Sequence, residues 1–195
     1  AGDVNIFASE RGIMRSYAIA ANPNDPRVSV ISSAVSGLSD SIQNLLGLEI
    51  EPNGNAGSIF IKTPKLQIAN DGVVTINAGG DGNAGQLDIV ADTIRLENNG
   101  TISATTTVGE GGDVNVRANS LFLDQSSINA STFEDRIGSN ISLNLDQGTI
   151  LDNASNISAQ AGEAGQDNSG GRNGGNGGNI QITSPFIVAL GNSDI

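Results

Sequence analysis

The residues of this chain that could carry acid–base chemistry are mainly its 21 Asp and Glu side chains. Most glycoside hydrolases place two carboxylates on either side of the bond they cleave, whereas polysaccharide lyases typically combine Ca²⁺ with a basic residue. The candidates here, Asp88, Asp113 and Asp124, are scattered, and no two Asp are adjacent. The chain also lacks His and Cys, which excludes Ser/His and Cys/His nucleophiles. We therefore expect no catalytic residue and no enzyme activity.

One segment resembles a calcium-binding repeat. Residues 79–84 read Gly-Gly-Asp-Gly-Asn-Ala, and the calcium-binding nonapeptide needs Gly-Gly-x-Gly-x-Asp in tandem copies. Ala84 stands where the Asp ligand belongs, and the motif occurs once. We expect an ordinary corner loop, with no metal or cofactor site, and leave open only weak Ca²⁺ binding at Asp81 or Glu110.

Two further patterns are also interpreted as structural. The Gly-rich run at 170–177 lacks the Lys-Ser/Thr ending of a phosphate-binding loop and opens no helix. Asn-x-Ser/Thr sequons are frequent in a chain this rich in Asn and Ser, and we expect their Asn residues to serve in turns and inter-strand ladders rather than as glycan sites. They begin at Asn99, Asn129, Asn140, Asn153 and Asn156.

A repeat of about 27 residues organises the chain that must position these groups. Each unit opens with Gly or a small residue, a polar residue, and two apolar residues that flank another polar one. From Gly57 through Gly85 and Gly112 to Ser139 the steps are 28, 27 and 27 residues. A fixed period in this range is typical of stacked repeats. The openings read Gly2-Asp3-Val4-Asn5-Ile6, Gly57-Ser58-Ile59-Phe60-Ile61, Gly85-Gln86-Leu87-Asp88-Ile89, Gly112-Asp113-Val114-Asn115-Val116, Ser139-Asn140-Ile141-Ser142-Leu143 and Gly178-Asn179-Ile180-Gln181-Ile182.

Each unit contains three short stretches in which apolar residues two apart share one strand face. The third stretch carries the signature Ile-x-Ala, so a second landmark keeps the same period. Gly and Asn between the stretches allow sharp corners. These features predict an all-β, right-handed parallel β-helix with three short strands per coil of about 27 residues, over residues 1–195 as one domain. A β-sandwich also uses many short strands, but it would not need this period. The signature pairs are Ile19/Ala21, Ile76/Ala78, Ile102/Ala104, Ile128/Ala130 and Ile157/Ala159.

Two regions depart from the repeat. Residues 22–56 are predicted to be a degenerate coil or insertion, with Val28-Ser29-Val30 as a candidate start of another coil because Val30 lies 26 residues after Val4 and 29 before Ile59. The apolar spacing over 38–46 indicates a short helix that covers the side or end of the rod. Residues 163–177 are predicted to be a Gly-rich corner loop.

Composition limits the partners. The net charge is −12 with nine Lys and Arg, which disfavours nucleic-acid binding because phosphates need cationic contacts. No apolar run is long enough for a transmembrane helix, and no signal peptide is visible. The lack of Cys suits export of an unfolded chain, because no disulfide can form early.

The repeats resemble those of the filamentous-haemagglutinin-like exoproteins of two-partner secretion systems, especially cyanobacterial ones. The likeness covers residues 57–195 well, 1–21 moderately and 22–56 poorly. It rests on Gly100-Thr101-Ile102-Ser103-Ala104, on the Gly-led openings, on residues 177–190, and on the closing Asn192-Ser193-Asp194-Ile195.

This resemblance implies an extracellular β-helix that is exported through an outer-membrane partner and serves as an adhesin, a surface fibre or a stalk. Because the chain starts and stops inside a repeat, we expect an internal segment of a longer polypeptide. We expect a structural or adhesive shaft segment that self-associates head to tail or continues a longer β-helix, with a host-surface or glycan receptor left open. The alternative is a polysaccharide-acting or carbohydrate-binding β-helix.

Overall fold

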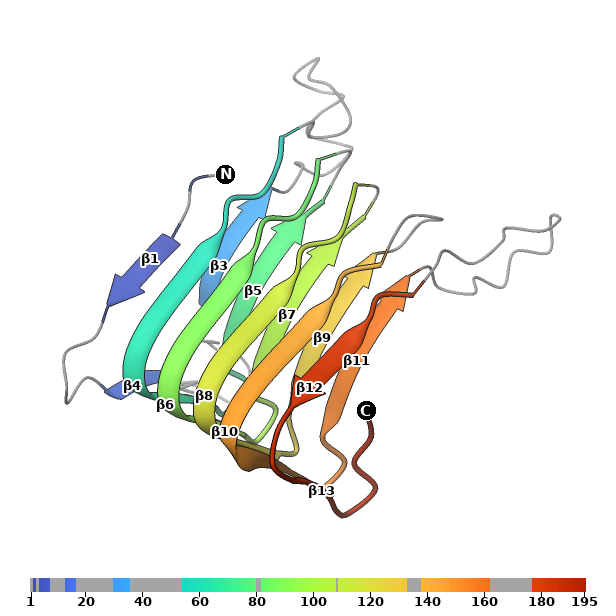
Figure 1. Cartoon of the computed structure of the whole chain (residues 1–195). Helices are drawn as coiled ribbons and strands as arrows, with labels where there is room; N and C mark the ends of the chain where they lie inside the picture. Colours follow the sequence, from blue (N-terminus) through green and yellow to red (C-terminus); the bar gives the residue numbers. More distant parts are fainter. Residues whose placement is uncertain are drawn as a thin grey trace, which may run out of the picture.

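The computed structural model describes residues 2, 4–7, 13–16, 30–35, 54–79, 82–107, 109–132, 138–161 and 177–195. Their strands form two parallel sheets that face each other across the interior (Figure 1). The long-strand sheet has the order β1 (Val4–Phe7), β4 (Ile59–Ala69), β6 (Leu87–Glu97), β8 (Val114–Asp124), β10 (Ile141–Asp152), β12 (Ile180–Thr183), with β2 (Ile13–Ser16) on β4 and β13 (Ile187–Ala189) on β10. The short-strand sheet has the order β3 (Val30–Val35), β5 (Val73–Ala78), β7 (Thr101–Thr106), β9 (Ser127–Thr132), β11 (Asn156–Ala161).

The repeat period of about 27 residues sets which residues pair in the long-strand sheet. Ile59 pairs with Leu87, Leu87 with Val114, and Val114 with Ile141. The chain descends through one sheet, ascends through the other and advances by one strand per coil (Figure 1), in the right-handed sense that parallel crossovers favour. The predicted right-handed parallel β-helix is therefore confirmed.

The first two predicted stretches of each central coil run together as one bent strand. In β6 the buried positions are 87, 89 and 91, and then 94 and 96. Strict alternation would bury position 93, so the step of three marks the bend, where Asp92 and Thr93 both lie outside the core. The stretches are separate strands only in the last coil, as β12 and β13, and in the first, as β1 and β2.

Residues with a left-handed backbone conformation make the corner between the long and the short strand. Asn98 and Asn99 have φ values of 49° and 64°, and Asn70 and Asp71 have 54° and 61° one coil earlier. Asn and Asp tolerate this region better than other non-Gly residues. The corner therefore recurs at one level in each coil and sends the chain back along the second sheet.

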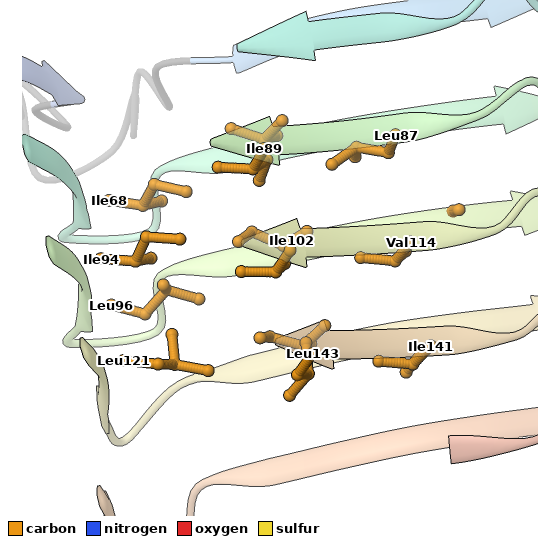
Figure 2. Close-up of a cluster of buried hydrophobic side chains, with 14 of the residues drawn as sticks. Ile68, Leu87, Ile89, Ile94, Leu96, Ile102, Val114, Leu121, Ile141 and Leu143 are labelled. Atoms are coloured by element: carbon orange, nitrogen blue, oxygen red, sulfur yellow. The ribbon is translucent and has the colours of Figure 1, made fainter. Parts of the chain in front are cut away.

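The core is a set of aliphatic columns between the two sheets (Figure 2). The first column stacks Ile59, Leu87, Val114 and Ile141, all at most 1% exposed. Successive coils are only about 4.8 Å apart, which leaves little room for aromatic rings. No aromatic residue belongs to this core cluster. Burial of these columns, about 25 cal/mol per Å² of apolar surface, is the main driving force for stacking.

One part of the Ile-x-Ala register was predicted wrongly. The pairs Ile102/Ala104, Ile128/Ala130 and Ile157/Ala159 align as expected. In β5, however, Val74 pairs with Ile102 and Ile76 pairs with Ala104. A shift by two residues keeps every side chain on its own face, so the pattern alone could not exclude it. The pair Ile19/Ala21 lies outside the described residues.

The prediction for Val30 was also wrong. Val30 pairs with Val73 in the short-strand sheet, so it opens a returning strand and not a new coil. The long-strand partner of Ile59 is Val4, 55 residues earlier, because the first coil includes the long segment between them. The predicted helix at 38–46 and the loop at 163–177, except its last residue, lie outside the described residues.

Candidate interaction surfaces

The three carboxylates considered for catalysis hold neighbouring coils together. Asp88 Oδ1 accepts a hydrogen bond from Asn115 Nδ2 at 3.0 Å. Asp113 Oδ1 accepts from the backbone N and the Nδ2 of Asn140, at 2.9 and 3.0 Å. The structure does not bring these carboxylates to one point, since Asp88 lies opposite Asn115 and not opposite Asp113.

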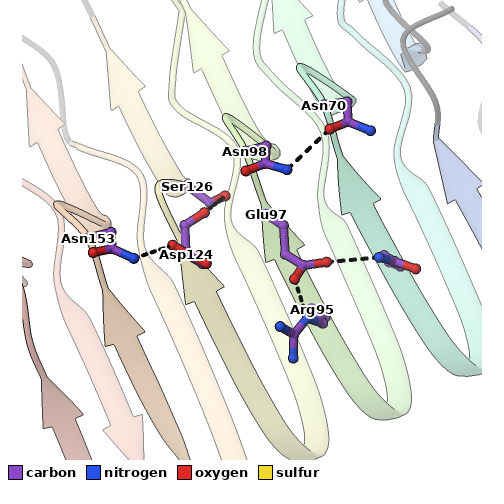
Figure 3. Close-up of polar contacts among 8 residues, drawn as sticks. Asn70, Arg95, Glu97, Asn98, Asp124, Ser126 and Asn153 are labelled. Atoms are coloured by element: carbon purple, nitrogen blue, oxygen red, sulfur yellow. Dashed lines mark hydrogen bonds and ion pairs between the residues drawn. The ribbon is translucent and has the colours of Figure 1, made fainter.

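Asp124 has the same role at the other end of β8. Its Oδ1 accepts from Asn153 Nδ2 at 2.8 Å (Figure 3). The carboxyl side chains at Glu97, Asp124 and Asp152 are in register on successive coils, and like charges so placed repel one another. Amide and guanidinium partners offset this repulsion, so the acidic column is a stabilised structural feature.

The segment that resembles a calcium-binding repeat also takes part in a ladder of hydrogen bonds between coils. Asn83 N donates to Asn55 Oδ1, and Glu110 N donates to Asn83 Oδ1, each at 2.9 Å. Asp81 lies outside the described residues. Within the part of the chain that the structure describes, no group of three or more His, Cys, Asp or Glu is arranged to hold a metal ion.

The sequon Asn residues behave as turn and ladder residues, as predicted. Asn99 Nδ2 donates to Asp71 Oδ1 at 3.0 Å in the corner. Asn140 and Asn153 make the inter-coil bonds described above. Asn129 Nδ2 donates to Ser127 Oγ at 3.0 Å, and Asn156 begins β11.

A charged cluster on the outside of the long-strand sheet was not anticipated. Arg95 Nε pairs with Glu97 Oε1 at 2.5 Å, and Gln67 Nε2 donates to Glu97 Oε2 at 2.8 Å (Figure 3). The Arg95 guanidinium lies 4.3 Å from the centroid of the Phe122 ring on the next coil. This cation–π contact covers part of an outward Phe.

The outward side of the short-strand sheet forms an uncharged surface, the hydroxyl face. Ser103 Oγ donates to Thr75 Oγ1 at 2.8 Å, and Ser158 Oγ donates to Asn129 Oδ1 at 3.2 Å. The rungs are about 4.8 Å apart, and alternate residues in a strand about 6.6 Å apart. On β5, β7, β9 and β11 this face contains Thr75, Asn77, Thr101, Ser103, Thr105, Ser127, Asn129, Ser131, Asn156, Ser158 and Gln160, and one apolar residue, Val73.

The hydroxyl face could have been found from the sequence. Thr101-x-Ser103-x-Thr105 and Ser127-x-Asn129-x-Ser131 occupy the polar positions of consecutive Ile-x-Ala strands. No sequence pattern predicts the Arg95–Phe122 contact, because this contact depends on the exact register of the bent strands.

The last coil carries most of the exposed large apolar side chains among the described residues. Phe186, Ile187, Leu190 and Ile195 are 45–50% exposed. The last coil also extends into the short-strand sheet, where Asp194 forms a bridge to Asn156. The remaining residue, Val30, is 54% exposed, and its pairing with Val73 places it on the outward side of the short-strand sheet.

In the described ranges no helix is both long and apolar enough to cross a membrane. No family model, curated protein or solved structure matches the chain.

Proposed function

We propose that this chain is a shaft segment of a secreted bacterial surface fibre or adhesin. The observation that carries the proposal is that the candidate carboxylates form hydrogen bonds between coils. Asp88, Asp113 and Asp124 bond from one coil to the next and do not converge on a common point. Carboxylates that reinforce the stack in this way suit a chain that bears load or displays other domains at a distance. The resemblance of its repeats to two-partner-secretion exoproteins supports an extracellular location and an outer-membrane export partner.

Detection on intact cells tests this function. An antibody raised against the chain should label unpermeabilised cells of the source bacterium, and immunogold should follow fibres at the surface. External protease should remove the label while a cytosolic marker stays intact. Labelling that appears only after the cells are lysed would refute the proposal.

A second candidate function is binding of a neutral glycan on the hydroxyl face. Its Ser, Thr and Asn side chains supply donors and acceptors and carry no charge, whereas the whole chain has a net charge of −12. The hydrogen bonds among them hold the array in place before a ligand arrives, which lowers the entropy cost of binding.

A glycan array tests this candidate. Ser103→Lys alters the centre of the hydroxyl face, and Asn144→Lys adds the same charge at an exposed position of the long-strand sheet. Binding lost in the first variant and kept in the second would support a glycan site. Release of reducing sugar from the bound glycan would instead favour the polysaccharide-acting alternative.

A further inference from the structure

The hydroxyl face carries no charged side chain at any of its described positions. Its residues form three columns that cross β3, β5, β7, β9 and β11. The outward side of the long-strand sheet differs, because Lys62, Asp88 and Arg117 lie on neighbouring strands there. In a chain with 21 acidic and nine basic residues, such a face suits a partner that is itself uncharged. The first column contains Val30, Val73, Thr101, Ser127 and Asn156, the second Ser32, Thr75, Ser103, Asn129 and Ser158, and the third Ala34, Asn77, Thr105, Ser131 and Gln160.

The hydroxyl face is also a regular lattice. Each short strand pairs with the next over six residues without a register shift, and Figure 1 shows these strands side by side in one direction. Rungs are about 4.8 Å apart and alternate residues about 6.6 Å apart, so the face measures about 24 by 20 Å. A ligand that uses the whole lattice must therefore be flat and must repeat at a similar spacing.

Hydrogen bonds within the face hold its side chains in place and leave further capacity for bonding. Ser103 Oγ donates to Thr75 Oγ1 at 2.8 Å, and Asn129 Nδ2 donates to Ser127 Oγ at 3.0 Å. A hydroxyl also has two acceptor lone pairs, and a side-chain amide has two donor hydrogens. Ser103 can therefore still accept, and Asn129 can still donate, when a ligand lies on the face.

The size and composition of the face disfavour a single soluble sugar and a second protein. The face has no aromatic ring on which a sugar could stack. A lone sugar on a flat lattice would be covered from one side, whereas small-ligand sites bury most of the ligand surface. A protein would bury about 480 Å² on each partner by the dimensions above, and the total of about 1,000 Å² is less than stable complexes usually bury.

We propose that the hydroxyl face adsorbs to the ordered surface of crystalline cellulose. The site is the one proposed above for a neutral glycan, and this assignment rests on that second candidate function. Cellulose is uncharged, and its extended chains lie side by side in flat sheets with hydroxyl groups on every ring. The distance from ring to ring is close to the spacing of the coils, so a glucan chain that lies along the rod axis meets one rung per ring. Each contact is weak, but a solid presents many of them at once, and linked contacts reinforce one another.

Adsorption to microcrystalline cellulose tests this assignment. The chain is mixed with the solid at about 0.15 M NaCl, and the protein that stays in solution is measured after centrifugation. Ser103→Lys should lower the partition coefficient about tenfold or more, because it presses an ammonium group against a neutral solid. Asn144→Lys, at an exposed position of β10 in the long-strand sheet, is the matched control and should adsorb as the wild type does. A wild-type chain that stays in solution, or equal adsorption of Ser103→Lys and the wild type, would overturn the proposal.

Asn77→Lys separates lost binding from lost folding. Asn77 lies in the third column, is exposed and pairs with Thr105, so the fold should accept the longer side chain. We expect an unchanged circular-dichroism spectrum and melting temperature, and adsorption that falls as it does for Ser103→Lys. Normal adsorption of a folded Asn77→Lys chain would overturn the proposal, because the third column would then lie outside the contact.

Other forms of the ligand separate the ordered surface from the glycan site in general. Acid-swollen cellulose and soluble cello-oligosaccharides have the same chemistry without the crystal lattice, and they should bind about tenfold or more weakly. Equal binding of the soluble form that Ser103→Lys abolishes would uphold the glycan site and reject the ordered surface. Adsorption to chitin but not to cellulose would have the same meaning. Surface labelling of cells by a chain that binds no glycan would uphold the shaft and reject both roles of the hydroxyl face.

Discussion

Thr149 is the residue at which an interior column changes from aliphatic to polar. It lies in register between Leu121 and Ile187, is 0% exposed, and its Oγ1 has no hydrogen-bond partner in the described structure. A buried hydroxyl without a partner costs about 1–3 kcal/mol. The bulge between Leu145 and Gly148 brings Thr149, rather than Ile150, to the inside.

Replacement of this hydroxyl should therefore stabilise the protein. We expect Thr149→Val to raise the free energy of unfolding by about 1 kcal/mol, measured by urea denaturation. Thr105→Val, at an outward position of β7, should change it by less than about 0.5 kcal/mol. A lower stability for Thr149→Val would mean that the hydroxyl is satisfied in solution.

Asn98 combines two properties that substitutions can separate. Its φ is 49°, and its Nδ2 donates to Asn70 Oδ1 at 3.2 Å on the preceding coil. Asn98→Gly removes the side-chain bond but suits the backbone, whereas Asn98→Ala also adds the strain of a left-handed Ala, about 1–2 kcal/mol.

The expected order of stability is wild type, then Asn98→Gly, then Asn98→Ala. The exposed side-chain bond contributes about 0.5–1 kcal/mol, so glycine should cost little and alanine clearly more. Thermal and urea unfolding would measure the difference. Equal effects of the two substitutions would show that the corner relaxes without strain.

At the scale of the strand and its corner, glycines ahead of the long strands let neighbouring coils approach closely. Gly85 lies two residues before β6, and its added Cβ would meet Gly57 O at 2.5 Å and Gly57 C at 2.7 Å. Both neighbours are backbone atoms, which cannot rotate away as a side chain could. We expect Gly85→Ala to lower the free energy of unfolding by about 2 kcal/mol or more, with Gly2→Ala as the neutral control, since nothing lies within 4 Å of a Cβ built on Gly2. Equal unfolding midpoints for these two variants would contradict this explanation.

The strands were predicted well where the repeat opening and the alternating apolar pair recur together. They were predicted poorly where one apolar pattern fits two registers. The repeat openings marked the start of the long strands, because Gly, or Ser139 ahead of β10, and an alternating apolar pair recur together there. The pair Val74/Ile76 fits the inside as well as Ile76/Ala78 does, so a two-residue slip was invisible. The union of two stretches into β6 was missed because a bend with two outward residues, Asp92 and Thr93, resembles a break. The polar positions of the hydroxyl face were visible in the sequence. Only the side-by-side pairing of β5, β7, β9 and β11 shows that these positions form one surface.

At the scale of the whole molecule, net charge opposes the stacking that the apolar columns favour. The chain has a net charge of −12, and folding places like charges on successive coils, as in the column of Glu97, Asp124 and Asp152. The repulsion acts over the Debye length, about 30 Å at 0.01 M salt and about 8 Å at 0.15 M. Burial of the apolar columns depends little on screening.

Stability should therefore increase with ionic strength. Raising NaCl from about 0.01 to about 0.15 M should raise the melting temperature, measured by circular dichroism, because salt screens the repulsion among the carboxylates. A melting temperature that falls as salt is added would instead mean that ion pairs such as Arg95–Glu97 stabilise the fold more than the repulsion destabilises it.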